Sequence, residues 1–203
     1  FQLSAHAVSE TLDFDRLLET VFLPEASKTG ASTDQLRVIR RRVALVIDGW
    51  VCVSSSDHSK QQCYQFFLHM LKIEPDKVVQ LSIVQALRTM IDDWDFKKEI
   101  FEPYLESFVT IFLQQLLPEV SLTETRLYVL NTLTDLIIQT KPLVNKQLLM
   151  KILEIVPKFW DIASNDPTES ILANVLLRLL RYLAISLRNY SYATWDISLN
   201  IIE

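Results

Sequence analysis

Glycine is nearly absent from this chain, and its absence limits the folds that the chain can adopt. Gly30 and Gly49 are the only glycines among 203 residues. Sandwiches and barrels of β-strands need a turn about every ten residues, and many of those turns require glycine. Two glycines so far apart also cannot form the Gly-rich loops that cradle phosphate groups. The remaining long stretches rich in Leu, Ile, Gln and Lys predict an all-α fold.

Clusters of helix-breaking residues divide the chain into segments of about 12 to 20 residues. Within each segment, apolar residues recur at spacings of three and four, which is typical of an amphipathic helix. Asp166 before Pro167, and Ser121 with Glu124, match patterns that cap helix N-termini, and Pro157 predicts a kink. The expected helices cover residues 14–23, 35–53, 60–72, 76–94, 103–117, 123–139, 144–164 and 167–188, and a ninth begins near Tyr192.

The second helices of successive pairs recur at a regular interval. Aligning these helices places Arg40, Gln80, Arg126 and Ser170 at matching positions, with offsets of 40, 46 and 44 residues. Periods of about 40 to 47 residues, each a helix pair, are typical of HEAT and armadillo repeats, and the pattern favours HEAT. The predicted fold is an α-α superhelix, a single HEAT-repeat solenoid. Its pairs cover about residues 14–53, 60–94, 97–140 and 142–188, with a partial fifth at 192–203.

Charge and cysteine content narrow the function classes. The net charge of −5 disfavours direct nucleic-acid binding through bulk charge. Cys52 and Cys63 are the only two cysteines, which suits a reducing compartment and supplies no disulfide or metal framework. No uninterrupted apolar run reaches about 18 residues, so we expect no membrane insertion. Because the chain begins with Phe1 and ends within a helical pattern, we interpret it as a segment of a longer protein.

Polar side chains gather along one side of the second helix in three of the pairs. The opposite, apolar side of each helix would be buried against neighbouring repeats. Because second helices line the concave surface of a solenoid, we expect the polar arcs to form one solvent-facing strip that binds a partner. The alternative is that these arcs are only solvated. The candidate residues are Gln85, Arg88, Asp92, Tyr128, Asn131, Asp135, Asn174, Arg178 and Arg181.

The charge of this strip changes along the chain. It is acidic near Asp92 and Asp135 and basic near Arg178 and Arg181. A partner with the opposite charge gradient would be steered and oriented by the strip, because complementary charges guide association. The strip therefore favours a cargo that is basic at one end.

Three aspartates, Asp92, Asp93 and Asp95, form an acidic cluster at the end of the fourth expected helix. The cluster lacks further ligands at suitable spacing for a metal and lacks a partner for acid–base catalysis. We interpret it as a solvated helix end or as a contact for a basic partner. No Cys-His or Ser-His-Asp arrangement is suggested by spacing elsewhere. The sequence therefore predicts no enzyme, no catalytic residue, no metal and no cofactor.

Basic and aromatic residues are expected to hold the repeats together. In the run from Arg40 to Arg42, Arg40 or Arg42 is expected to pair with acidic side chains of an adjacent repeat. All four tryptophans lie near expected helix ends, where we expect them to fill the seams between repeats. These tryptophans are Trp50, Trp94, Trp160 and Trp195.

Three stretches together resemble a known family. They are RRRVALVIDGWV at 40–51, DKVVQLSIVQALRTMIDDWDF at 76–96 and FEPYLESFVTIFLQQL at 101–116. Their order and period resemble importin-β-type nuclear transport receptors, and within them the importin-eleven group with its fungal counterpart, karyopherin one-twenty. The resemblance covers about residues 14–187, nearly the whole chain.

This resemblance implies a function in nuclear transport. Receptors of this family bind Ran in its GTP state and carry cargo proteins through the nuclear pore, so they shuttle between cytoplasm and nucleus. They also contact Phe-Gly nucleoporins through apolar slots on the convex face. Cargo that is basic or related to ribosomes is expected. The competing hypotheses are a non-transport HEAT scaffold that mediates protein assembly and, ranked last, an α-helical synthase that uses the acidic cluster.

Overall fold

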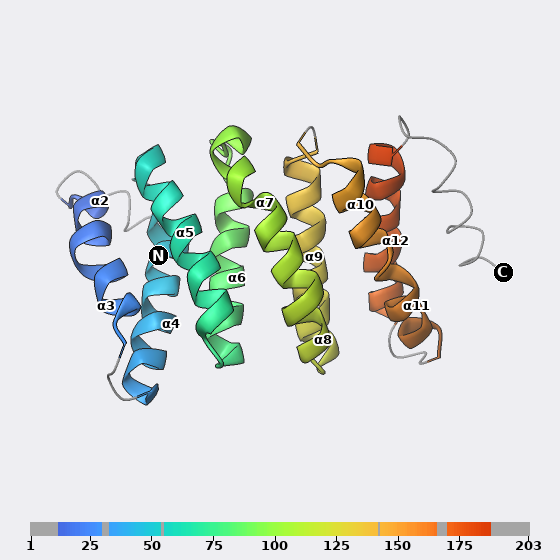
Figure 1. Ribbon diagram of the computed structural model, residues 1–203, viewed down its shortest axis with the longest axis horizontal. Helices are drawn as coiled ribbons and strands as arrows, with labels where there is room; N and C mark the ends of the chain where they lie inside the picture. Colours follow the sequence, from blue (N-terminus) through green and yellow to red (C-terminus); the bar gives the residue numbers. More distant parts are fainter. Residues whose placement is uncertain (1–11, 30–32, 54, 142, 166–169, 188–203) are drawn as a thin grey trace. The chain divides into compact units, whose positions relative to one another are not determined.

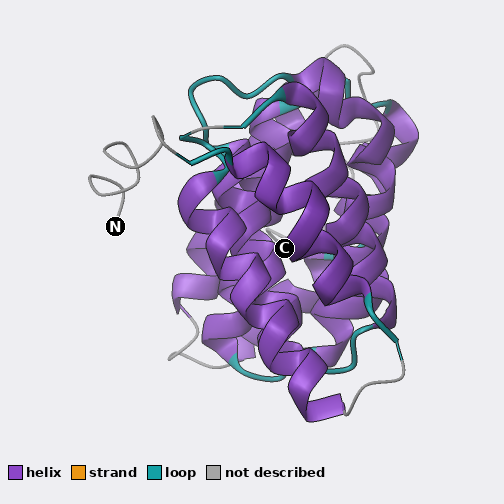
Figure 2. Ribbon diagram, turned by 90° about the vertical axis from the view of Figure 1, so that its left-hand side faces the viewer, coloured by secondary structure: helices purple, strands orange, loops and turns teal. Residues whose placement is uncertain are grey.

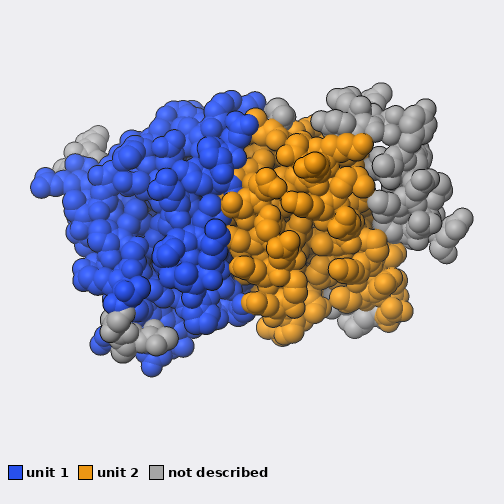
Figure 3. All heavy atoms as spheres, viewed as in Figure 1, with its two compact units in different colours: residues 1–104 blue, residues 105–203 orange. Residues whose placement is uncertain are grey.

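The structure, a computed structural model, describes residues 12–29, 33–53, 55–141, 143–165 and 170–187. These residues form helices joined by short loops and contain no strand, so the all-α class is confirmed (Figure 2). The chain divides into two compact units, Phe1–Tyr104 and Leu105–Glu203, which Figure 3 shows in different colours. We describe unit 1 and unit 2 separately.

Unit 1 contains helices in two layers. Helices α4 and α6 pack side by side, and α5 lies in front of them in Figure 1. This is the arrangement that the helix-pair pattern predicts, in which α4 and α6 are successive second helices. The large side chains of Phe14, Ile47, Phe67 and Ile83 are fully buried in the core of this unit. Its elements are α2 (Phe14–Leu17), η1 (Leu18–Phe22), α3 (Leu23–Ser27), α4 (Thr33–Trp50), α5 (Asp57–Ile73), α6 (Lys77–Ile91) and the start of α7 (Lys98–Ile111).

Unit 2 repeats this arrangement with α9 and α12 as the second helices. Helix α12 packs against α9, α10 and α11. By length and composition α12 could cross a membrane, and 33% of it is buried inside the structure, Leu176 and Leu183 among the buried residues. The elements after α7 are η2 (Phe112–Leu116), α8 (Leu117–Glu119), α9 (Thr123–Gln139), α10 (Lys146–Leu153), α11 (Val156–Asn165) and α12 (Ser170–Leu187).

Two first helices continue through a proline before which the sequence predicts the end of a helix. A π-helical turn precedes the proline in both places, η1 before Pro24 and η2 before Pro118. Proline lacks an N–H, and its ring would clash with the carbonyl four residues back in a regular α-helix. The wider turn relieves that clash. The first helical segment therefore ends at Ser27, not at residue 23.

Other predicted helix ends are partly corrected. The helix over 123–139 has the predicted bounds, but Leu122 is its N-cap without a side-chain hydrogen bond, so the predicted Ser121 capping box is wrong. The predicted kink at Pro157 is a break between α10 and α11. The cap predicted at Asp166 and the ninth helix near Tyr192 lie outside the described residues.

The predicted roles of the basic and aromatic residues have mixed outcomes. Arg40 pairs with Glu74 of the next helix pair, which confirms that prediction. Trp50 stacks on Phe14 with ring centroids 6.0 Å apart. Trp94 is 93% exposed, so the prediction that it fills a seam is wrong. The reason is that α6 ends at Ile91, which leaves Trp94 in the following loop.

Candidate partner-binding surfaces

Helices α4 and α6 form the second-helix surface of unit 1. One carboxylate on α4 links the two helices. Asp48 near the end of α4 accepts a hydrogen bond from Nε2 of Gln85 at 2.8 Å and one from Oγ1 of Thr89 at 2.5 Å. Gln85 and Thr89 are one turn apart on α6, so both can meet the same carboxylate. The candidate Gln85 is exposed and also links two helices within the unit.

Two other candidates on α6 are accessible charges. Nε of Arg88 lies 3.8 Å from Oδ2 of Asp92, and their side chains are 32% and 51% exposed. Exposed pairs of this kind contribute about 0.2–1 kcal/mol, so a partner could replace the contact at little cost. Arg88 and Asp92 therefore offer both signs of charge to a partner.

The second-helix surface of unit 2 is held by an ion pair between α12 and α9. Nη2 of Arg178 lies 2.8 Å from Oδ1 of Asp135, and Nη1 donates to Oδ1 of Asn131 at 3.4 Å. The Asp135 side chain is only 9% exposed, whereas that of Arg178 is 44% exposed. Three of the candidate residues are thus brought together in one cluster.

The burial of Asp135 corrects the sequence-based expectation that every candidate faces solvent. Asp135 lies within the polar arc of α9, and α12 packs against α9 and holds Asp135 in an ion pair with Arg178. A buried carboxylate needs its cationic partner, because removing one member of such a pair leaves an uncompensated charge. Asp135 is therefore a structural residue, and the acidic end predicted for the strip is lost in unit 2.

The remaining candidates on this surface are polar and accessible to different degrees. Tyr128 and Asn131 are half-buried, and Asn174 and Arg181 are exposed on α12. Arg181 makes no ion pair with any residue that the structure describes, so its charge is directed at solvent. The nine predicted residues fall into two groups, three on unit 1 and six on unit 2. That the groups form one contiguous strip stays a prediction.

A hollow opens on the opposite layer of unit 1, between the first helices of two successive pairs. It has a volume of about 380 Å³, within the range of small ligand pockets. Helix α5 supplies an aromatic wall through Phe66, which is 6% exposed. The amide of Gln62 has a buried Oε1 with no hydrogen-bond partner among the described residues. We call this the outer hollow; its lining is Glu19, Leu23, Pro24, Ser27, Gln62, Gln65, Phe66 and His69.

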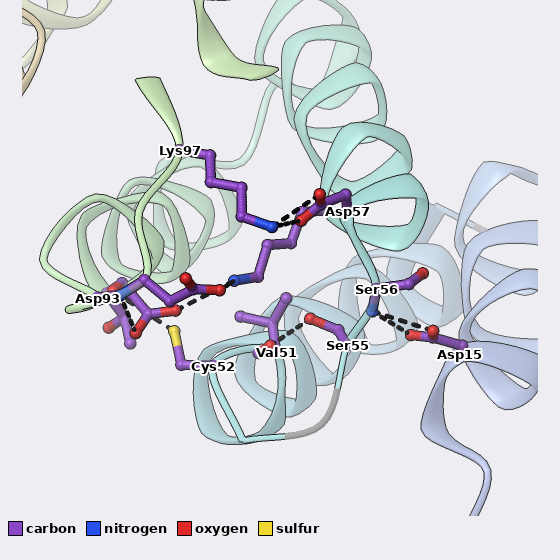
Figure 4. A network of polar contacts seen from close by, with 11 residues as sticks. Asp15, Val51, Cys52, Ser55, Ser56, Asp57, Asp93 and Lys97 are labelled. Atoms are coloured by element: carbon purple, nitrogen blue, oxygen red, sulfur yellow. Dashed lines mark hydrogen bonds and ion pairs between the residues drawn. The ribbon is translucent and has the colours of Figure 1, made fainter. Parts of the chain in front are cut away.

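Ion pairs tie the ends of two helix pairs together along one edge of unit 1 (Figure 4). Nζ of Lys60 lies 3.2 Å from Oδ2 of Asp93, with side chains only 11% and 3% exposed. Nζ of Lys97 contacts both carboxylate oxygens of Asp57 at 2.8 Å. That hydrogen bond raises the pKa of Lys97. The interpretation of the acidic cluster as a solvated helix end is therefore wrong for Asp93.

Burial holds the cysteine beside this network in its protonated form. Burial, and secondarily the carboxylate of Asp93, raises the pKa of Cys52 to about 12. Its thiol donates to the carbonyl of Thr89 at 3.6 Å. Because the thiolate is the nucleophile and the metal ligand, a protonated Cys52 serves neither role at neutral pH. Among the described residues there is also no group of three or more His, Cys, Asp and Glu that could hold a metal.

Several residues that build these surfaces were missed from the sequence. Asp48 carries a detectable signal, because it is the only carboxylate between Asp34 and Asp57. An isolated acid in a basic and apolar helix suggests a specific partner. The sequence carries no such signal for the outer hollow, because the predicted helix ends before Pro24 and Ser27, which line it.

Comparison with known proteins reveals similarity along the whole chain. It is 58% identical over 202 residues to the importin beta-like protein KAP120 of Saccharomyces cerevisiae. It is also 30% identical to human importin-11 over 135 residues, which are 66% of this chain and 13% of importin-11. No family model matches the chain.

A solved structure agrees with these relatives. The structure of Lph2, described as a novel bidirectional nuclear transport receptor in S. cerevisiae, superposes with a TM-score of 0.94 at 58% identity. The match covers 100% of this chain and 20% of that receptor. The chain likewise spans 20% of KAP120. The match to a receptor of this kind confirms the predicted superhelical class of fold.

Proposed function

The chain belongs to the importin-β family of nuclear transport receptors, and we propose that it forms part of a receptor that carries cargo between cytoplasm and nucleus. The observation that carries this proposal is the 58% identity over the whole chain, together with the TM-score of 0.94 to a nuclear transport receptor. The chain spans a fifth of those relatives. Transport, Ran-GTP binding and shuttling are therefore proposed for the full-length receptor that contains these repeats.

Binding to Ran separates this proposal from the alternative of a non-transport scaffold. We expect the full-length receptor to retain Ran loaded with GTP and to release Ran loaded with GDP in a pull-down. A HEAT scaffold that only assembles other proteins would not distinguish the two nucleotide states. Equal retention of both forms, or of neither, contradicts the transport proposal.

We propose that the second-helix surfaces of the two units contribute to cargo binding. In unit 2 the support comes from Arg181 and Asn174, which are exposed on α12 and take no part in the Arg178–Asp135 pair. In unit 1 it comes from Arg88 and Asp92, whose side chains are 32% and 51% exposed. Exposed charges of this kind steer and orient a partner. The partners are cargo proteins, which include basic or ribosome-related proteins.

A double substitution on α12 tests the cargo surface. Asn174→Glu with Arg181→Glu should weaken binding of a cargo whose facing segment is acidic about tenfold, because it reverses the basic charge that α12 presents. The melting temperature should be nearly unchanged, since both side chains are exposed. The measurement is the dissociation constant of the full-length receptor for its cargo, with Lys158→Glu on exposed α11 as the matched control. Equal affinities of the double variant and the control contradict the proposal.

The outer hollow supports a second contact, with Phe-Gly nucleoporins. Its aromatic wall at Phe66 would pack against an incoming phenyl ring, and the side chain of Gln62, which lines the same hollow, would contact the peptide backbone. Both features lie on the first-helix layer, opposite the second-helix surfaces. The hollow therefore suits a phenyl side chain together with the adjoining peptide backbone.

Filling the hollow tests this contact without removing a buried side chain. Ser27→Trp places an indole in the hollow from an exposed position and should weaken binding of a Phe-Gly repeat peptide about fivefold. Surface plasmon resonance on the full-length receptor measures this, with exposed Ser164→Trp as the control. Other Phe-Gly sites on the receptor would lower the effect, so the stoichiometry is measured as well. Unchanged stoichiometry and affinity rule out the hollow as a site.

A further inference from the structure

Three large apolar side chains are exposed on the second-helix surface of unit 1. Val38 and Leu45 on α4 are 55% and 39% exposed, and Val78 on α6 is 51% exposed. Val38 and Leu45 are separated by about two helical turns, so they lie on the same side of α4, opposite the fully buried Ile47. Apolar side chains gathered on one face of a protein mark interaction sites. We call Val38, Leu45 and Val78 the apolar patch.

Two polar links hold α4 and α6 in a register that brings the apolar patch together. Near the start of both helices, Nη1 of Arg37 lies 3.3 Å from Oδ2 of Asp76, the N-cap of α6. Near the end of α4, Asp48 accepts a hydrogen bond from Gln85 of α6 at 2.8 Å. The two helices are therefore parallel neighbours, as Figure 1 shows. The two valines of the patch are one repeat of 40 residues apart in sequence, so this register places them beside each other.

The free charge beside the apolar patch is positive. Arg41 and Arg42 follow the first patch residue of α4 by about one turn, and both side chains are exposed. Neither makes an ion pair with any residue that the structure describes. Both carboxylates of α4 are engaged by contrast, since Asp34 lies 3.6 Å from Arg37 and Asp48 is bound by side chains of α6. The charge that α4 offers to a partner is therefore basic.

We propose that the apolar patch, with Arg41 and Arg42, docks an amphipathic helix of a partner protein that has an apolar stripe flanked by Asp or Glu. Apolar side chains at positions i, i+4 and i+7 of such a helix span about 10 Å, which matches the two-turn separation of Val38 and Leu45. Carboxylates beside the stripe would meet the two guanidinium groups, which suit bidentate hydrogen bonds to carboxylates. A basic segment would meet like charge at the same place.

This site goes beyond the cargo contacts proposed above. It lies on the same surface of unit 1, but none of its residues is among the candidates for cargo binding. It also requires neither Ran nor the outer hollow. A test with a designed peptide can therefore fail while the transport proposal stands, and it can succeed while that proposal fails.

A designed peptide tests the site in the full-length receptor. The probe is a fluorescein-labelled helical peptide with leucine at positions i, i+4 and i+7 and glutamate on both sides of that stripe, and fluorescence anisotropy measures its dissociation constant. Val38→Ser with Val78→Ser should weaken binding about tenfold, because it removes the apolar surface that the leucines bury. Arg41→Gln with Arg42→Gln should weaken binding about fivefold and reduce its dependence on salt.

The matched controls lie on α12, in the other unit. Ile171→Ser changes an exposed apolar side chain and Arg181→Gln an exposed arginine, and both should leave the affinity unchanged. The melting temperatures of all variants should stay close to that of the wild type, since exposed side chains contribute little to the folded state.

Four results would overturn the proposal. The first two are that the wild-type receptor does not bind the peptide, and that either double variant binds it as tightly as the wild type. The third is equally tight binding of a peptide with lysine in place of glutamate, which would show that the arginines do not select an acidic partner. The fourth is equally tight binding of a scrambled peptide that lacks the leucine stripe, which would reduce the contact to charge alone.

Discussion

Replacing Arg40 with methionine is expected to lower the free energy of unfolding of the repeats in unit 1 by about 3–5 kcal/mol. The guanidinium is 9% exposed and the Glu74 carboxylate 2% exposed, with Nη1 and Oε2 2.7 Å apart. Nε donates to the carbonyl of Ala26 at 3.0 Å and Nη2 to that of Lys28 at 3.3 Å. The substitution leaves Glu74 charged and buried, and it leaves two carbonyls without their donors. This is the most costly single change that the described contacts predict.

Chemical denaturation followed by circular dichroism measures this loss. Arg41→Met is the matched control, because Arg41 is the exposed neighbour and makes no ion pair among the described residues. A second variant, Arg40→Met with Glu74→Met, should recover much of the loss, since it removes the uncompensated charge. If Arg40→Met costs no more than Arg41→Met, the pair does not hold the helix pairs together.

Alkaline pH is expected to destabilise unit 1 steeply above pH 9. Burial raises the pKa of Cys63 above its ordinary value of 9.0, and burial raises the pKa of Tyr64 above 10.0. Both groups stay neutral in the folded state and release a proton on unfolding. The stability that this supplies is complete below the unfolded pKa and is lost as pH rises past it. Each group removes about 1.4 kcal/mol per pH unit in that range.

Comparison of the wild type with Cys63→Ala isolates one of these groups. Unfolding free energies from urea titrations at about pH 7 and about pH 10 should fall less in the variant, by about 1.4 kcal/mol. The values at pH 7 serve as the internal control for the packing change. Equal losses in the two proteins contradict the assignment of a buried neutral thiol.

Local patterns in the sequence predicted helix bounds correctly where residue type along the helix decides where it begins and ends. Apolar spacing gave the helix over 123–139 with the bounds that the structure has. The prediction that a helix ends before Pro24 is wrong, because a π-helical turn lets the helix continue through the proline. No residue type marks such a turn in the sequence. The prediction for Trp94 is wrong for a related reason, since the predicted helix extends three residues beyond the true end of α6 at Ile91.

The candidate surface illustrates the same limit in three dimensions. Helical periodicity placed Asn131, Asp135 and Arg178 on polar arcs, and all three do meet in one cluster. Periodicity describes one helix at a time, so it could not predict that α12 packs against α9 and buries Asp135. The outer hollow depends likewise on two helices from different pairs.

The sequence by itself determined the all-α class and the helix-pair period, because these depend on residue type and spacing along the chain, and it indicated the family by its resemblance to known receptors. Only the tertiary structure decided which polar residues face solvent. Asp93 and Asp135 are buried in ion pairs, while Trp94 is exposed in the loop after α6. The physical reason is that burial is a property of how helices pack on one another. A charged residue can enter the interior where a partner on another helix compensates it, and an aromatic one can stay outside where the chain turns away from the core.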